Sequence, residues 1–262
     1  MRRRLPLPVV VPALIATAFI VVPVLALVAR APWGRFAEVL TGGGASSALR
    51  LSLVVSLAAT ALSVLFGVPL AWILARAKFP GRSVLRALVI LPLVLPPVVG
   101  GIALLTALGR SGVIGGWLRD TFGIQLTFTT WGAVIATTFV AMPLVVLAAE
   151  AGFRSLDPRF EGAAATLGAG PWYTLRRVVL PMAAPQIAAG AVLAWARALG
   201  EFGATITFAG NLAGRTQTLP LAVYQARQTD AAGAIALSLV LVVISVTVLV
   251  ALRDRVTGTG SG

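Results

Sequence analysis

Long apolar stretches alternate with shorter polar segments along the whole chain. Six of them can be delimited, at residues 9–29, 49–75, 87–108, 131–151, 186–209 and 233–252. Each holds about 20 residues or more, which is enough for a helix to cross roughly 30 Å of hydrocarbon. The pattern therefore predicts an all-α membrane protein with about six transmembrane helices.

The first apolar stretch stands apart from the other five. The segment that follows it contains three consecutive glycines and is predicted to be flexible. A cleaved signal peptide is the competing interpretation of this stretch, but the run is too long and no small-residue cleavage site follows it. We therefore divide the chain into an N-terminal helix with an outer linker, a transmembrane domain and a short cytoplasmic tail, at residues 1–47, 48–252 and 253–262.

Basic residues gather at the ends of the apolar stretches. If the N-terminus lies inside, thirteen Lys and Arg residues fall in inner segments and seven in outer ones, while Arg197 lies within a stretch. The positive-inside rule then places both termini in the cytoplasm. The net charge of +13 does not predict nucleic-acid binding, because the basic residues are not clustered on one face.

The composition argues against catalysis. The chain has no Cys and no His, which excludes disulfides, thiolate chemistry and zinc sites. An intramembrane serine protease would need a base, and Lys78, the only lysine, lies at a membrane edge. The Gly-rich phosphate-binding motif that ends in Gly-Lys-Ser/Thr is also absent. Any ATP-driven work would therefore use another polypeptide.

A polar loop at residues 154–185 interrupts this membrane-like pattern. Its helix-starting and helix-breaking residues predict two short helices joined by a tight turn at Gly168, on the cytoplasmic side. The residues that would bound these two helices are Asp157, Pro158, Gly168, Gly170, Pro171, Pro181 and Pro185. A surface pair of helices of this kind is typical of a docking site for another protein.

The fifth stretch carries two opposite charges. Arg197 and Glu201 are four residues apart, on one face of the predicted helix. A charge inside the membrane is expensive, so it usually pairs or lines a cavity. A structural ion pair and a role in a transport pathway both remain open. The nearby residues that we assign tentatively to a pathway or gate are Gly200, Gly203, Thr205 and Asn211.

Two other features of the stretches bear on the path through the membrane. The run Leu91–Pro97 contains three prolines and predicts a bend, related either to a pathway or to ordinary packing. Glu150, at the end of the fourth stretch, is interpreted as a solvated edge residue.

The spacing of residues in the polar loop resembles the cytoplasmic coupling motif of ABC importer permeases. That motif reads Glu-Ala-Ala, three residues, Gly, nine residues, Ile, one residue, Leu-Pro. Its alanines, glycine and Leu-Pro fall on Ala163, Ala164, Gly168, Leu180 and Pro181. Gly162 stands where the family has Glu, and Glu161 precedes it, about 100° further around a helix.

Within that family, residues 196–211 and 217–224 resemble the molybdate and tungstate permeases. The resemblance implies a type I importer fold with cytoplasmic coupling helices, in a prokaryotic inner membrane. It also implies a homodimer, two cytoplasmic ATPase subunits that use ATP and Mg, and an extracytoplasmic molybdate-binding protein. No cofactor would bind this chain. The alternatives are a sulfate or thiosulfate permease and, from another class, an autonomous channel or ion-coupled transporter.

Overall fold

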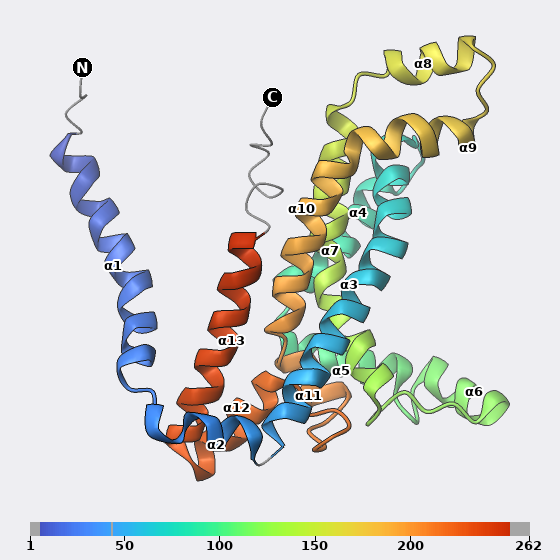
Figure 1. The fold of residues 1–262 in the computed structure, drawn as a ribbon. Coiled ribbons are helices and arrows are strands. Elements are labelled where there is room, and N and C mark those ends of the chain that lie inside the picture. Colours follow the sequence, from blue (N-terminus) through green and yellow to red (C-terminus); the bar gives the residue numbers. More distant parts are fainter. Residues whose placement is uncertain (1–5, 43, 252–262) are drawn as a thin grey trace.

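The computed structural model describes residues 6–42 and 44–251, and within them every regular element is a helix (Figure 1). Arg2, Arg3, Arg4 and the tail at 253–262 lie outside the described residues. The helices in chain order are α1 Leu7–Ala29, η1 Trp33–Arg35, α2 Phe36–Thr41, α3 Ala45–Arg76, α4 Arg82–Val94, α5 Pro97–Leu108, α6 Val113–Phe122, α7 Thr130–Ser155, α8 Arg159–Thr166, α9 Pro171–Thr174, η2 Leu175–Val179, α10 Leu180–Leu199, α11 Gly203–Phe208, α12 Leu219–Thr229 and α13 Ala231–Ala251.

Five helical segments are long and apolar enough to cross a membrane. They are α1, α3, α7, the continuous segment Pro171–Leu199 and α13. A sixth is obtained if α4 and α5 are counted as one broken span, since they meet at an angle of 119°. This confirms the prediction of an all-α membrane protein with about six spans. The third span is not one helix, however, because Pro96 and Pro97 cannot continue the hydrogen-bond ladder of α4.

The centre of the bundle is formed by α3, α7 and α10. Small residues recur on the buried face of α3, where Ser56, Ala59 and Ser63 are fully buried. On α10, an added Cβ at Gly190 would lie 2.7 Å from Cβ of Ala148 on α7. Small residues let helix backbones approach closely in a membrane, and this packing fixes the scaffold that holds the site.

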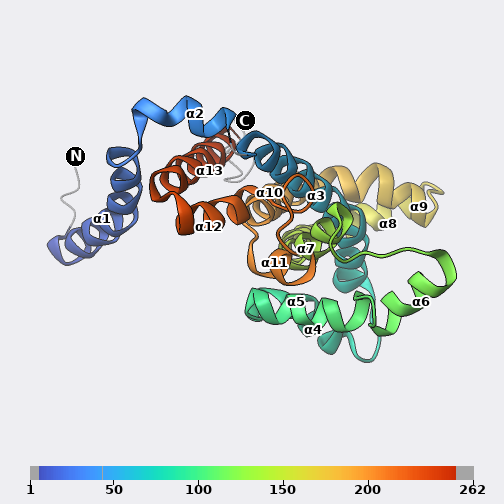
Figure 2. The ribbon, with the colours of Figure 1, turned by 90° about the horizontal axis from the view of Figure 1, so that it is seen from below.

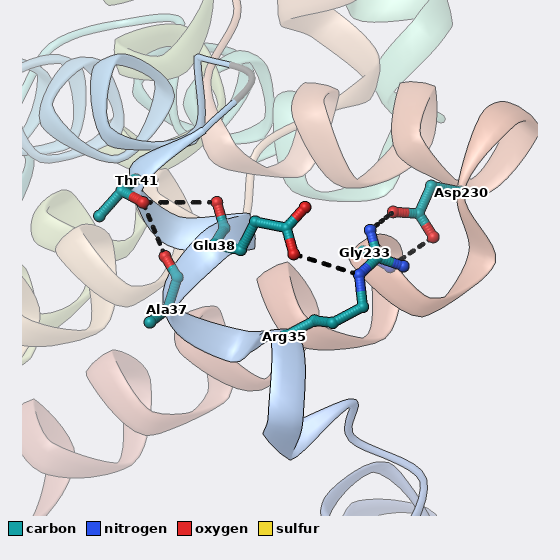
Figure 3. A network of polar contacts seen from close by, with 6 residues as sticks. All are labelled: Arg35, Ala37, Glu38, Thr41, Asp230 and Gly233. Atoms are coloured by element: carbon teal, nitrogen blue, oxygen red, sulfur yellow. Dashed lines mark hydrogen bonds and ion pairs between the residues drawn. The ribbon is translucent and has the colours of Figure 1, made fainter.

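The N-terminal helix packs little on this bundle. None of the described residues of α1 is buried, and in Figures 1 and 2 it stands beside α13, joined to α3 through α2. Part of the linker is helical, as η1 and α2. Arg35 lies 3.4 Å from Glu38 and 3.9 Å from Asp230, so ion pairs connect η1 to α2 and to the junction of α12 and α13 (Figure 3).

The two ends of the bundle differ in what they carry. The start of α1, the end of α13 and the α8–α9 loop lie at one end, while α2, α6, α11 and α12 lie toward the other (Figure 1). The segment around residues 218–226, predicted to be too short to span, is the helix α12. The functional candidates from the sequence therefore separate into two regions, one near each end.

Candidate functional site: the α8–α9 loop and the break between α10 and α11

The first helix of the polar loop, α8, begins and ends close to where the sequence indicates. It starts at Arg159, with Pro158 as the N-cap, so the start is one step later than Asp157 would set. Asp157 still provides a hydrogen-bond acceptor for the free amides at this end, because its Oδ1 accepts a hydrogen bond of 2.9 Å from the Arg159 amide. The carboxylate therefore lies at the positive end of the helix.

The turn after α8 is a Schellman motif. The Ala169 amide donates to the Ala164 carbonyl and the Gly168 amide donates to the Ala165 carbonyl, both at 3.0 Å. Gly168 has φ of +82°, in the left-handed region that glycine adopts without strain. The tight turn predicted at Gly168 is thus present.

The second loop helix differs from the prediction. Pro181 and Pro185 do not end it, because α9 continues through a π turn at Leu175–Val179 into the transmembrane helix α10. Pro181 has no amide hydrogen, and its ring would clash with the carbonyl four residues earlier in a regular helix. The widened turn just before Leu180 accommodates the proline, so the loop and the span form one segment. Leu180 packs on the core cluster that includes Val179.

Glu161 is directed toward the bundle and not toward open space. Its Oε1 lies 2.6 Å from Nη2 of Arg76, at the end of α3, and both side chains are partly buried. A Cβ at Gly162 would meet no atom within 4 Å. The glutamate of this chain therefore attaches α8 to α3, while the position of the motif glutamate faces free space. On the same helix Ala164 is buried and Ala163 is exposed.

The tip of the loop is apolar and exposed. Leu167 has 87% of its surface exposed, and Trp172 and Tyr173 are exposed as well. Exposed apolar residues around an ordered turn are typical of a surface that another protein covers.

Replacing Gly168 with Arg is expected to block transport without preventing membrane insertion. A Cβ at position 168 would meet no atom within 4 Å, so a side chain fits. The positive φ costs about 1–2 kcal/mol, and the arginine would project from the apolar tip. Gly162→Arg is the control, since it adds the same group on α8 where φ is not positive. Membrane-fraction blots and uptake assays measure both variants. Wild-type uptake by a well-expressed Gly168→Arg variant contradicts the expectation.

The second region is a break in the fifth span that hydropathy does not reveal. The stretch predicted at 186–209 ends as a helix at Leu199, with Gly200 as its C-cap, and the short helix α11 begins only at Gly203. Glu201 therefore does not lie within a helix, in contrast to the prediction, whereas Arg197 lies in the last turn of α10.

The carboxylate of Glu201 joins the two sides of this break. Glu201 is only 2% exposed. Its Oε2 lies 2.5 Å from Nη1 of Arg197, and its Oε1 accepts a hydrogen bond of 2.8 Å from the Ala204 amide in α11. Arg197 keeps 32% of its side chain exposed. The pair is therefore formed by a buried carboxylate and a partly exposed arginine.

The short helix α11 rests on α5 with almost no space between the backbones. A Cβ at Gly203 would lie 2.7 Å from Cβ of Pro97, and a Cβ at Gly101 would lie 2.6 Å from Cβ of Thr207. The two broken spans thus meet at their breaks. Irregular backbone at membrane depth is tolerated where protein or a water-filled cavity surrounds it.

The tentative pathway residues do not all converge. Arg197, Gly200, Glu201 and Gly203 lie at the break, but Thr205 is fully buried and its hydroxyl lies 3.5 Å from that of Thr137 on α7. Asn211 lies further along, where its amide donates to Gln225 of α12 at 3.2 Å. The break is therefore the part of the predicted set that forms a cluster.

A second buried carboxylate was wrongly assigned from the sequence. Glu150 is 2% exposed and not a solvated edge residue. Its carboxylate binds Nε of Arg86 on α4 and Nη2 of Arg154, each at 3.1 Å. The spacing of Glu150 and Arg154, four residues apart, was a usable signal, whereas Arg86 lies 64 positions away. Within the described residues, no cluster of carboxylates is suited to hold a metal ion.

Residues 67–257 match the family described as "Binding-protein-dependent transport system inner membrane component", and the chain belongs to this family. It is a multi-pass membrane permease, the non-catalytic component of an ABC importer. Its fold is that of a bacterial alginate ABC transporter, which was solved in complex with a periplasmic protein. The two structures superpose with a TM-score of 0.75 at 22% sequence identity, over 97% of this chain and 95% of the other.

Sequence similarity to curated relatives is more specific than the similarity of fold. The molybdenum transport system permease of Mycobacterium tuberculosis is 48% identical over 88% of both chains, and that of Escherichia coli is 48% identical over 70% of this chain and 80% of its own. The Escherichia coli sulfate transport system permease CysT is 38% identical over 83% of this chain and 80% of its own.

Proposed function

We propose that this chain is the membrane permease of an importer that carries molybdate, or the related tungstate, into the cytoplasm by alternating access. The 48% identity to molybdenum permeases over most of both chains carries this proposal. The lower identity of 38% to a sulfate permease makes sulfate or thiosulfate the second candidate.

The ATP-driven step belongs to a partner. The exposed apolar tip at Leu167 and Trp172 supports docking of a cytoplasmic ATPase subunit, which would bind ATP and Mg itself. The residues proposed to couple the two proteins are Asp157, Glu161, Ala163, Ala164, Gly168, Leu180 and Pro181. The start of α1 and the end of α13 lie at the same end as this tip, which supports cytoplasmic termini (Figure 1).

The other partners follow from the same assignment. A solute-binding protein would deliver the oxyanion to the opposite end, where α2, α11 and α12 lie. Two copies of this chain and two ATPase subunits would complete the importer. Closure of the ATPases would move α8, and the continuous segment from α9 to α10 would carry this motion to the break at Glu201.

Reconstitution tests the proposal directly. Liposomes that contain this chain, its ATPase and a molybdate-loaded binding protein are expected to take up molybdate only when ATP is inside and the binding protein is outside. An ATPase-dead complex is the control. Uptake of sulfate but not molybdate would favour the second candidate, and uptake without ATP would support an autonomous transporter or channel.

A further inference from the structure

A basic cavity of about 340 Å³ lies beside the start of α4. Three of the residues that line it are arginines, and the full set is Phe79, Gly81, Arg82, Ser83, Arg86 and Arg154. Five of these residues follow the end of α3 at Arg76, which is paired with Glu161 of α8, and Arg154 lies in the last turn of α7. The cavity therefore lies at the same end of the bundle as the polar loop and is separate from the break between α10 and α11.

The charges around this cavity do not balance. Arg86 and Arg154 share one carboxylate, that of Glu150, which is almost completely buried. Arg82 has no carboxylate partner within 4 Å among the described residues. The lining thus holds three arginines against the one carboxylate of Glu150, and the two excess positive charges favour an additional negative group in the cavity.

The backbone at the start of α4 adds hydrogen-bond donors to the same place. Gly81 is the N-cap, so no side chain caps this end, and the first turn holds no acidic residue. The first bond of the helix runs from the Leu85 amide to the Gly81 carbonyl, which leaves the amides of residues 82–84 without a helical partner. These amides and the helix dipole attract an anion.

We propose that this cavity binds a tetrahedral oxyanion group, of the phosphate type, through Arg82 and the first turn of α4. Such a group accepts several hydrogen bonds at once, which suits a guanidinium fork together with backbone amides. It can come from the headgroup of an anionic phospholipid or from a free oxyanion in the cytoplasm. Exposed apolar residues on α4, Val84 and Leu88, place this helix at the perimeter of the chain, where lipid has access.

The experiment uses the purified full chain in nanodiscs and separates the two sources. In one arm, native mass spectrometry counts phosphatidylglycerol retained by the protein in discs that also contain phosphatidylcholine. In the other, inorganic phosphate is titrated into discs of phosphatidylcholine alone and followed by calorimetry. Binding in the first arm identifies lipid, and binding in the second identifies a free oxyanion.

Two variants and one control complete the test. Arg82→Gln is expected to weaken binding about tenfold or more. Ser83→Asp should also abolish binding, because its own carboxylate occupies the first turn, yet it should raise thermal stability. Arg177→Gln, which removes the same charge from an exposed site on η2, should bind like the wild type.

Three outcomes overturn the proposal. The first is that the wild-type chain binds neither phosphatidylglycerol nor phosphate. The second is that Arg82→Gln binds as tightly as the wild type. The third is that Arg177→Gln loses as much affinity as Arg82→Gln, which would indicate general surface charge.

Discussion

Replacing Arg197 with Ala is expected to destabilise the protein by about 3 kcal/mol and to abolish transport. Glu201 would then remain almost completely buried without its cation, 2.5 Å from where Nη1 had been. This loss of free energy of unfolding is at the lower end of the usual range for a broken buried ion pair, because Arg197 is 32% exposed. The transition temperature of the purified chain and its reconstituted uptake measure the two effects.

The double variant Arg197→Gln with Glu201→Gln is the matched control. It removes both charges, keeps the size of the Glu201 side chain, and leaves a side-chain oxygen that can still accept from the Ala204 amide. We therefore expect the double variant to be more stable than Arg197→Ala. Additive losses in a full double-mutant cycle would show that the two residues do not act as a pair. If the double variant is stable but inactive, the charge of Arg197 or of Glu201 contributes to transport itself.

The second large effect is expected at the contact between the broken spans. Gly101→Ala should cost about 1–3 kcal/mol and reduce uptake strongly, since the new methyl lies 2.6 Å from Cβ of Thr207 and 3.1 Å from the Ala204 carbonyl. One of these neighbours is backbone, so α5 and α11 would have to separate. Thermal unfolding and uptake are the measurements.

The adjacent glycine provides the control. Gly100→Ala adds the same methyl to the same helix, but its nearest neighbour is a ring carbon of Phe139 at 3.2 Å. The ring can shift by a few tenths of an ångström, and alanine favours a helix over glycine by about 1 kcal/mol. Gly100→Ala should therefore be close to neutral. Equal losses for the two variants would mean that the α5–α11 contact is not the cause.

The spans and the Gly168 turn could be predicted because their signals are local. Hydropathy over about 20 residues identifies a span, and a glycine followed by Gly170 and Pro171 identifies the turn. The break after Leu199 could not be predicted in this way, since most residues beyond Glu201 are again apolar and hydropathy continues the stretch. Nor could the partner of Glu150 on α4, because such pairings depend on how distant helices pack.

The two prolines of the loop failed as stop signals for a similar reason. Local rules place a helix end at Pro181, but a π turn upstream removes the clash and lets the helix continue. The ion pair of Glu161 with Arg76 could likewise not be predicted from the family motif, because the motif places its glutamate one residue later.

The helix α8 is connected to the bundle at three separate points. Residues 156–158 join it to the end of α7, the ion pair of Glu161 with Arg76 joins it to the end of α3, and the chain through Gly168 joins it to α9 and α10. Because these attachments lie on different helices, we expect a displacement of α8 to rotate α3, α7 and α10 relative to one another. Without the Arg76 pair, the displacement would reach only α7 and α10.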